Sequence, residues 1–499
     1  MKKKVSLFLV LALVFSFAAS LTSCDYFRFP FDSTSQSSSS SSSNTSIHSS
    51  TTDGDHKQPD PSDPGSTKPD KISPINVIMI NDNHGILNEE KGSLDKIASG
   101  INYYDSLGDI VKIANGDMFQ GTYMSSTLRG LPMLDALNAM NFDAFVIGNH
   151  EFDWGLEEMK KYKDGDTSNG EASFPFLGAN IYDKRTNEMV DWFEPYAVIE
   201  LSEVTVGIIG IIGDVETSIL RSNVEDYDFV DPTDIVRDLA AELRTERGCD
   251  AVIVSIHGDN RILNQSLAAF DGDSRIDGIF TGHSHTPTDE EIVRDDGSSV
   301  CVLQNGGYGE SLAVLTLEFD ENKTVTDTDG NLNYTDTFTS TGILSGVFAK
   351  YGDYISIGDE VILTTEFGED RYDVAMAVVY SMYEKYDVAY SFINSGGVRA
   401  GIDAGDVTYA DLFQILPFEN EVYIITMRGR DLRNYLNNLG SVYYWGIGTN
   451  AINNEQEYQI AIVDYLFQSY YFDDYRTDTY FDTNDLIRDV FIDYIKACN

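Results

Sequence analysis

The stretch Ala144-Phe145-Val146-Ile147-Gly148-Asn149-His150-Glu151-Phe152-Asp153 decides the fold class. Its first four residues are apolar and include β-branched side chains, which is typical of a buried strand. The residues that follow bring an amide, an imidazole and carboxylates together directly after that strand. Polar clusters at strand ends are where layered α/β domains place their sites. The stretch therefore predicts an α/β fold with a functional site at the end of this strand.

The same arrangement recurs along the chain. Apolar, strand-like runs lie at 75–81, 110–114, 251–256 and 276–281, and segments with helical spacing lie at 131–140 and 232–247. Continuous apolar runs indicate strands that are buried on both faces, so we expect a layered α/β domain. The polar residues that follow these runs are Asp82, His84, Asp117, His257, His283 and His285.

Five of the seven histidines follow such runs, and His48 and His56 lie outside the predicted fold. A single histidine in this position is more often a hydrogen-bonded structural residue, but five together with nearby Asp and Asn residues favour a metal site. Imidazole, carboxylate and amide ligands without cysteine suit divalent Zn, Mn, Fe, Co or Mg. Seven candidate ligands are too many for one ion. They predict two ions that share a carboxylate, an arrangement that recurs in phosphate ester hydrolysis.

Charge and length exclude one class of function and set the number of domains. The 499 residues contain 34 Lys and Arg against 81 Asp and Glu, which gives a net charge of −47. Binding to nucleic-acid polymers depends on basic residues that neutralise phosphates, so this chain is a poor candidate for it. The composition is that of a globular protein, and the length predicts two domains.

The amino end resembles an export signal. Lys2, Lys3 and Lys4 precede an apolar run over 5–19, which is too short for a permanent membrane span. The run ends in Leu21-Thr22-Ser23-Cys24, which is similar to a bacterial lipobox, so we expect a signal peptide at 1–23 and a lipid on Cys24. The alternative is an ordinary secretory signal that ends near a cysteine. The first reading predicts an extracytoplasmic lipoprotein that is anchored to the bacterial cell membrane.

Residues 24–74 are rich in Ser, Thr, Pro and Asp and predict a disordered tether, because such a composition cannot bury a core. With Cys24 lipidated, the remaining cysteines are Cys249, Cys301 and Cys498. Because three cysteines cannot all pair within the chain, the sequence implies no disulfide framework. Two of the three can still form one disulfide bridge.

The motifs resemble a known family. Asp-x-His, Gly-Asp, Gly-Asn-His-Glu, a lone His and Gly-His-x-His, in this order, are similar to the calcineurin-like metallophosphoesterases. The longer Gly-Asn-His-Glu-Phe-Asp string and Asn-Ser-Gly-Gly-Val-Arg at 394–399 resemble the secreted 5'-nucleotidases, a family that includes UDP-sugar hydrolases and cyclic-nucleotide phosphodiesterases. The resemblance covers roughly residues 75–499.

The resemblance implies a fold and a set of site residues. The fold would be a four-layer α/β/β/α catalytic domain at 75–325, a linker at 326–353 and a smaller α/β substrate-binding domain at 354–499. One metal would be held by Asp82, His84 and His285, the other by Asn149, His257 and His283, and Asp117 would bridge them. His150 would contact the phosphate, and Asp153 would orient His150.

The second domain has weaker motifs. Asn394 and Arg399 match substrate-binding positions, and Phe418 matches an aromatic residue that stacks on the nucleobase. The family usually has a second stacking aromatic followed by a Gly-Gly-Asp-Gly turn. No such turn follows here, and Tyr465 is the candidate for the aromatic position. The Arg that usually begins this domain's first helix is also absent, unless Arg371 is a displaced equivalent.

The leading hypothesis is an extracytoplasmic dimetal phosphohydrolase, a 5'-nucleotidase that converts nucleoside monophosphates to nucleoside and phosphate by metal-activated water. The nearest alternative is a UDP-sugar hydrolase or 2',3'-cyclic-nucleotide phosphodiesterase on the same centre. The alternative without an enzymatic activity is a lipoprotein that only binds a ligand. Such a protein would have no need for suitable residues at all seven metal-ligand positions.

Overall fold

The computed structural model describes residues 72–87, 94–477 and 479–498. The predicted signal peptide, the lipid on Cys24 and the tether up to residue 71 lie outside the described residues. Within the last positions of the predicted tether, Ile72 is buried and packs into a hydrophobic core cluster. The predicted tether therefore extended too far at its carboxyl end.

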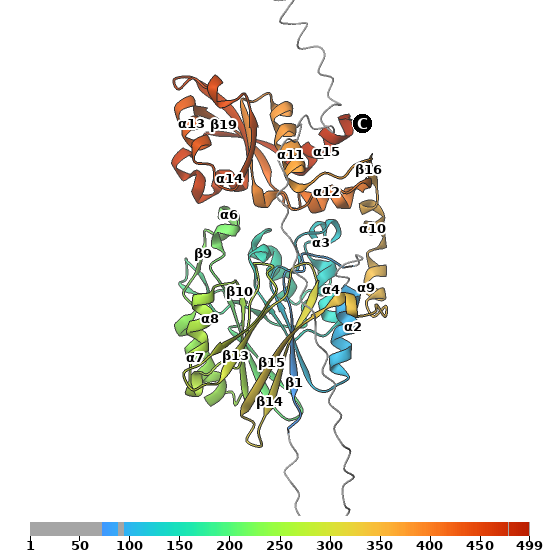
Figure 1. Cartoon of the computed structure of the whole chain (residues 1–499), viewed down its shortest axis with the longest axis vertical. Coiled ribbons are helices and arrows are strands. Elements are labelled where there is room, and N and C mark those ends of the chain that lie inside the picture. The colour runs from blue at the N-terminus through green and yellow to red at the C-terminus, as the bar shows by residue number, and fades with distance from the viewer. Residues whose placement is uncertain (1–71, 88–93, 478, 499) are drawn as a thin grey trace, which may run out of the picture. The chain divides into compact units, whose positions relative to one another are not determined.

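Two six-stranded sheets form the first part of the described chain (Figure 1). In the first sheet the strands have the order β15 (Val325–Tyr334), β14 (Ser311–Phe319), β1 (Ile75–Ile80), β2 (Ile110–Asn115), β3 (Ala144–Val146) and β4 (Phe176–Leu177). In the second the order is β12 (Thr288–Val293), β13 (Ser299–Gln304), β11 (Gly278–Phe280), β10 (Ala251–His257), β8 (Thr205–Ile212) and β7 (Tyr196–Glu200). The strand predictions from the apolar runs are confirmed.

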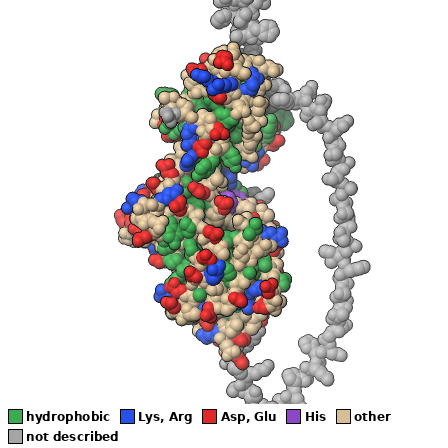
Figure 2. Space-filling view, turned by 90° about the vertical axis from the view of Figure 1, so that its left-hand side faces the viewer, with side chains coloured by type: hydrophobic (Ala, Val, Ile, Leu, Met, Phe, Trp, Pro, Cys, Tyr) green, Lys and Arg blue, Asp and Glu red, His purple; other side chains and the backbone are tan. Residues whose placement is uncertain are grey.

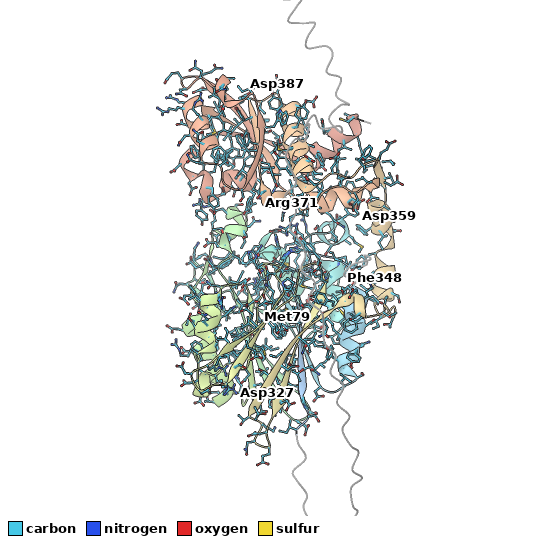
Figure 3. The ribbon with its side chains drawn as sticks, in the orientation of Figure 1. Met79, Asp327, Phe348, Asp359, Arg371 and Asp387 are labelled. Carbon is cyan, nitrogen blue, oxygen red and sulfur yellow. The ribbon has the colours of Figure 1, made fainter. Side chains whose placement is uncertain are left out.

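Three apolar clusters show how the layers pack. Val77, Met79 and Ile113 of the first sheet share a cluster with Ile208 and Ile253 of the second, so the two sheets face each other. Met79, labelled in Figure 3, lies in this packed interior. The opposite faces of the sheets are covered by helices, which completes the four-layer α/β/β/α order and confirms that prediction.

The helices of this part differ in length and exposure. Against the first sheet pack α2 (Leu94–Asp105) and α4 (Leu131–Ala139), and against the second α7 (Thr233–Thr245) and α8 (Arg261–Ala268). Shorter helices are α3 (Tyr123–Thr127), α5 (Leu156–Lys160) and α6 (Arg221–Val224). A small sheet joins β5 (Ile181–Asp183), β6 (Glu188–Met189) and β9 (Tyr227–Phe229).

The predicted linker at 326–353 needs a correction. Its first nine residues belong to β15, which pairs antiparallel with β14 over Ser311↔Tyr334 to Phe319↔Val325. The strand is polar because it lies at the edge of the sheet and most of its side chains are at least partly exposed. An apolar-run criterion misses such a strand. The helices α9 (Ser345–Lys350) and α10 (Gly352–Gly358) follow it.

The second part of the chain is built on a five-stranded mixed sheet. Its order is β20 (Val442–Gly446), β17 (Tyr390–Asn394), β21 (Glu457–Val463), β19 (Glu421–Arg428) and β22 (Tyr480–Leu486). A two-stranded sheet joins β16 (Val361–Thr365) and β18 (Gly405–Thr408). The helices are α11 (Arg371–Tyr386), α12 (Tyr409–Ile415), α13 (Gly429–Asn437), α14 (Asp464–Gln468) and α15 (Ile487–Cys498).

The surface reflects the acidic composition. On the face that Figure 2 shows, Asp and Glu side chains are spread over both parts of the described chain instead of gathering in one patch. Among the helices described here, none combines the length and the apolar character that crossing a bilayer requires.

Candidate metal centre and substrate cavity

The loops that follow the central strands carry the predicted metal ligands. The strands β1, β2 and β3 are parallel neighbours in one sheet, and β10 and β11 are parallel neighbours in the other. Their carboxyl ends therefore lie at one edge of each sheet, and a hydrogen bond from Asn115 Nδ2 to the carbonyl of Ile256 joins the two edges at 3.0 Å. This edge brings together Asp82, His84, Asp117, Asn149, His257, His283 and His285.

Five of these seven residues have a left-handed backbone. The φ angles are 50° at Asp82, 53° at His84, Asp117 and His285, and 74° at His283. Non-glycine residues in this region cost roughly 1–3 kcal/mol each, and such outliers cluster at functional sites. The loops thus accept strain that turns these side chains toward one point.

A first group of ligand atoms comes from Asp82, His84 and His285, whose nitrogen and oxygen atoms lie within 4.8 Å of one another. The Nδ1 of His84 lies 3.1 Å from the carbonyl oxygen of Gln120, so Nδ1 carries the proton and Nε2 presents a lone pair. That Nε2 lies 3.1 Å from His285 Nε2, which lies 3.2 Å from Asp82 Oδ1. The buried Asp82 Oδ1 accepts no hydrogen bond from any residue in the described part of the chain.

A second group comes from Asp117, His257 and His283, again within 4.8 Å. The Nδ1 of His257 donates to the Asn115 carbonyl at 2.8 Å, and its Nε2 faces Asp117 Oδ2, 3.2 Å away. Asn149 joins this group, because its Oδ1 lies 2.7 Å from His283 Nδ1 and 3.1 Å from His257 Nε2.

Asp117 connects the two groups, since it also lies within 4.8 Å of His84. Its loop is held by Glu151, whose carboxylate accepts from the backbone N–H groups of Asp117 and Gly148 at 2.8 Å and of Met118 at 3.1 Å. Burial, together with the charge of Asp117, raises the pKa of Glu151 to about 7. Glu151 lies inside the motif from which the fold was predicted, yet we assigned it no role from the sequence.

These donor atoms fit divalent cations. Imidazole nitrogens face carboxylate and amide oxygens at about hydrogen-bond distance, and the Nδ1 protons of His84 and His257 point away from the centre toward carbonyl groups. Such atoms repel one another unless a positive charge lies between them. Imidazole with carboxylate and amide oxygen suits Zn, Mn, Fe or Co at a shared pair of sites.

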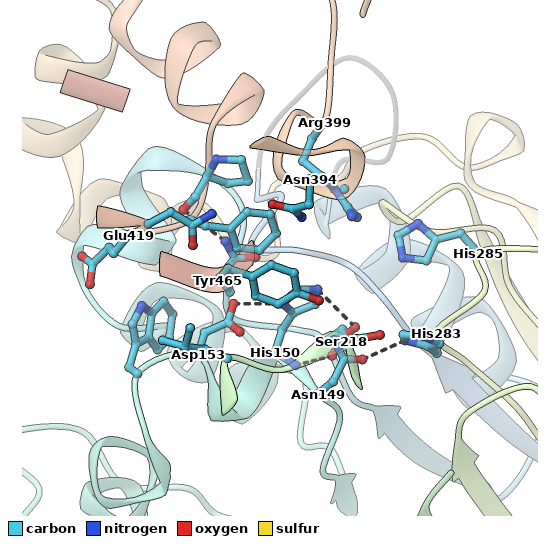
Figure 4. A pocket seen from close by; sticks show the side chains of 18 residues that line it. Asn149, His150, Asp153, Ser218, His283, His285, Asn394, Arg399, Glu419 and Tyr465 are labelled. Carbon is cyan, nitrogen blue, oxygen red and sulfur yellow. Dashed lines mark hydrogen bonds and ion pairs between the residues drawn. The ribbon is translucent and has the colours of Figure 1, made fainter. Parts of the chain in front are cut away.

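His150 lies beside this centre and is coupled to Asp153. The His150 Nδ1 is 2.9 Å from Asp153 Oδ2, and its Nε2 is 3.9 Å from Asp117 Oδ2 (Figure 4). Burial lowers the pKa of His150, but the carboxylates of Asp153 and Asp117 outweigh it and raise the pKa to about 9. These carboxylates therefore favour the protonated imidazole, whose Nε2 can donate a hydrogen bond to an anion. The ring of Phe418 stacks on His150, with centroids 5.6 Å apart.

A cavity of about 210 Å³ opens above the centre (Figure 4). All four residues that the sequence predicted for substrate binding line it, together with Trp154 and Leu220: Asn394, Arg399, Phe418 and Tyr465. The structure brings these residues to the same cavity as His150, Asp153 and His283. The hydroxyl of Tyr465 donates to the carbonyl of Thr217 at 2.8 Å.

Arg371 supports the loop that carries Asn394 and Arg399. Its guanidinium donates to the carbonyls of Ser395 and Val398, both at 2.6 Å. Arg371 begins α11, as the displaced arginine considered from the sequence would, but it contacts the loop backbone and does not line the cavity.

A second cavity of about 270 Å³ adjoins the first, and both are lined by Gln120, Arg399 and Pro417. Tyr308 lines only the second cavity, where its ring lies 5.2 Å from that of His84 and 5.1 Å from that of His285. Tyr308 was not predicted from the sequence, because a tyrosine after two glycines carries no motif.

Comparison with known proteins agrees with this geometry. The calcineurin-like phosphoesterase family matches residues 75–287, and the 5'-nucleotidase C-terminal domain matches residues 373–455, together more than half of the chain. A 5'-nucleotidase of Vibrio parahaemolyticus is 26% identical over 427 residues, which cover 73% of this chain and 74% of that protein. The endonuclease YhcR of Bacillus subtilis is 25% identical, and the match covers 74% of this chain but 33% of YhcR.

The fold is also that of solved structures. The structure of a 5'-nucleotidase precursor from Thermus thermophilus superposes with a TM-score of 0.72 at 20% identity, over 85% of this chain and 96% of that one. The chain thus has both domains of this architecture in the predicted order. It belongs to the calcineurin-like phosphoesterases that carry a 5'-nucleotidase C-terminal domain, a family of metal-dependent phosphoric ester hydrolases.

Proposed function

We propose that this enzyme hydrolyses nucleoside 5'-monophosphates to nucleoside and phosphate. One observation carries the proposal: two groups of metal-ligand atoms, joined by Asp117, lie at the base of a cavity whose walls include Arg399 and the aromatic rings of Trp154, Phe418 and Tyr465. The base of the cavity suits a phosphate, and the aromatic rings suit a nucleobase. Relatives named 5'-nucleotidase support this assignment.

The proposed metal sites follow the two groups. Asp82, His84 and His285 would hold one ion, Asn149, His257 and His283 the other, and Asp117 would bridge them. Two divalent ions held there would lower the pKa of a water and would neutralise charge that develops on the phosphoryl group. The protonated His150 Nε2 donates a hydrogen bond to a phosphate oxygen. The Asp153 carboxylate accepts a hydrogen bond from His150 Nδ1 and so fixes the orientation of that ring.

The second domain would select the substrate. Arg399 presents a fork of N–H donors that matches a phosphate or carboxylate, and Asn394 adds a polar contact beside it. One face of Phe418 is used by His150, so a nucleobase would stack on its other face or against Tyr465. Stacking contributes roughly 1–3 kcal/mol per base and tolerates different bases.

A second candidate reaction has an observation in its favour. The cavity beside Tyr308 could take the second ester group of a phosphodiester or UDP-sugar, and the chain lacks the Gly-Gly-Asp-Gly turn expected of the family. A panel of AMP, UDP-glucose, 2',3'-cyclic AMP and an aryl phosphate, assayed with Mn or Zn, separates the two. We expect the highest kcat/KM with AMP, and a higher value with either diester would reassign the substrate.

We also propose that the enzyme works outside the cytoplasm, tethered by a lipid on Cys24. The motif at 21–24 and a relative named as a cell wall protein support this location. Metabolic labelling with a radioactive fatty acid tests it. The natural chain should incorporate label and the Cys24→Ala variant should not, whereas equal labelling of both would refute the anchor.

A further inference from the structure

The loop between β13 and β14 crosses directly over the first ligand group. A Cβ placed on Gly307 would come within 2.5 Å of His285 Nδ1, so the loop backbone touches that ring. The next residue, Tyr308, has a left-handed φ of 64°, and its backbone N–H donates to the Asp82 carbonyl at 2.7 Å. Tyr308 is therefore anchored to the residues that would hold a metal ion, and its ring packs against His84 and His285.

The Tyr308 hydroxyl extends from this anchored ring to Arg399. It accepts a hydrogen bond from Arg399 Nη2 at 3.2 Å. Of the hydrogen bonds and ion pairs described for this chain, it is the only one made by the Arg399 guanidinium. The orientation of a long, partly buried arginine side chain is less restrained when its partner is removed, since a free arginine side chain carries about 2 kcal/mol of rotamer entropy.

The direction of this contact leaves the guanidinium available to substrate. Arg399 lines both cavities, whereas Tyr308 lines only the second. Tyr308 thus contacts Arg399 from the second cavity, and this contact uses one of the five N–H donors of the guanidinium. We propose that Tyr308 is a positioning residue that holds Arg399 ready for the phosphate of the substrate, an inference that rests on the proposed function.

The substitution Tyr308→Phe tests this role, because it keeps the ring against His84 and His285 and removes only the hydroxyl. We expect KM for AMP and the Kd for inorganic phosphate, measured by calorimetry on the metal-loaded protein, to rise about fivefold to tenfold. The value of kcat and the metal content should stay within about twofold of the natural enzyme. The matched control is Tyr334→Phe, at an exposed tyrosine of the neighbouring strand β15.

A double-mutant cycle tests whether Tyr308 affects phosphate binding through Arg399. In an Arg399→Ala background, Tyr308→Phe should cause no further change in the Kd for phosphate, because the group that Tyr308 holds is gone. A Tyr308→Phe effect of equal size in both backgrounds, or an unchanged Kd in the single variant, would overturn the proposal. A natural enzyme that neither binds phosphate nor hydrolyses AMP would instead refute the proposed function.

Discussion

Asp153 acts on the centre through one contact, the hydrogen bond between His150 Nδ1 and its Oδ2. The carboxylate both orients the imidazole and stabilises its positive form. In Asp153→Asn the ring keeps a neutral hydrogen-bond acceptor but loses the charge, so we expect kcat for AMP to fall about tenfold to a hundredfold. Phosphate release and metal content are the measurements.

A matched control is Glu157→Gln, which changes an exposed acid on α5. Its kcat should equal that of the natural enzyme. An Asp153→Asn variant with full kcat would contradict the role of the pair, and so would a variant whose loss of activity follows from loss of metal.

Asp464 is a buried acid that makes stability depend on pH. Burial raises its pKa to about 7, and the acids that face it, Glu421 and Asp482, add to the shift, whereas backbone N–H groups oppose it. Tyr423 also lies close to it. In the unfolded chain this carboxyl group ionises near pH 4, so the folded state binds the proton more tightly than the unfolded state. The free energy of unfolding therefore decreases as the pH rises from about 4 to about 7.

The substitution Asp464→Asn removes this ionisation. Relative to the natural protein, the free energy of unfolding of the variant should increase between pH 4.5 and pH 8, by an amount on the order of a few kcal/mol. Denaturant unfolding at both pH values measures it. A difference between the two proteins that does not change with pH would show that Asp464 ionises normally in the fold.

At the scale of elements, the site depends on close contacts between loops that follow different strands. A Cβ on Gly148, after β3, would come within 2.4 Å of Asp117 Oδ1 and 2.7 Å of the Asp117 backbone nitrogen, after β2. Only glycine allows this approach. The two loops therefore hold the carboxylate that joins the ligand groups in one position.

We expect Gly148→Ala to displace Asp117 and to weaken binding of metal at least tenfold, as measured by titration of the metal-free protein with Mn or Zn. Gly440→Ala is the control, since a Cβ there meets nothing within 4 Å. Thermal unfolding of the metal-free variants shows whether the fold is retained. A folded Gly148→Ala protein that binds both ions with natural affinity would contradict the role of this contact.

Elements that bury apolar side chains could be predicted from the sequence. Elements with mostly exposed, polar side chains could not be predicted in this way. The runs that became β1, β2, β3 and β10 are continuous and apolar, and the structure brings the polar residues after them together. The strand β15 was not predicted, because it lies at the edge of the sheet and has a polar sequence, most of whose side chains are at least partly exposed to solvent.

Contacts between loops that are distant in the sequence could not be predicted either. The hydrogen bond from Arg399 to Tyr308 joins residues 91 positions apart, and no spacing in the sequence indicates it. The stacking of Phe418 on His150 likewise depends on how the loops after β3 and α12 meet. Residues of this kind become visible only when the fold is known.

At the scale of the whole molecule, residues from both sequence regions line one cavity. The ligand groups come from residues 82–285, and Arg399, Phe418 and Tyr465 come from the carboxyl-terminal region. Under the proposed function, a phosphate ester with no base would contact the first set fully and the second only in part. The net charge of −47 gives no general attraction for an anion, so binding depends on this local set.

Tyr465→Ala separates the two contributions. We expect KM for AMP to rise about tenfold, because a stacking surface for the base is lost, and KM for a simple aryl phosphate to change much less. Steady-state kinetics with both substrates measures the difference. Tyr471→Ala, at a far more exposed tyrosine nearby, is the control, and equal effects on both substrates would show that Tyr465 serves the fold and not the base.

The most direct test of a dimetal phosphohydrolase is metal analysis combined with activity on the same preparation. We expect about two divalent ions per chain by mass spectrometry of the purified protein, loss of AMP hydrolysis when a chelator removes them, and recovery when Mn or Zn is returned. Full activity after complete removal of metal, or recovery with one ion per chain, would contradict the central claim.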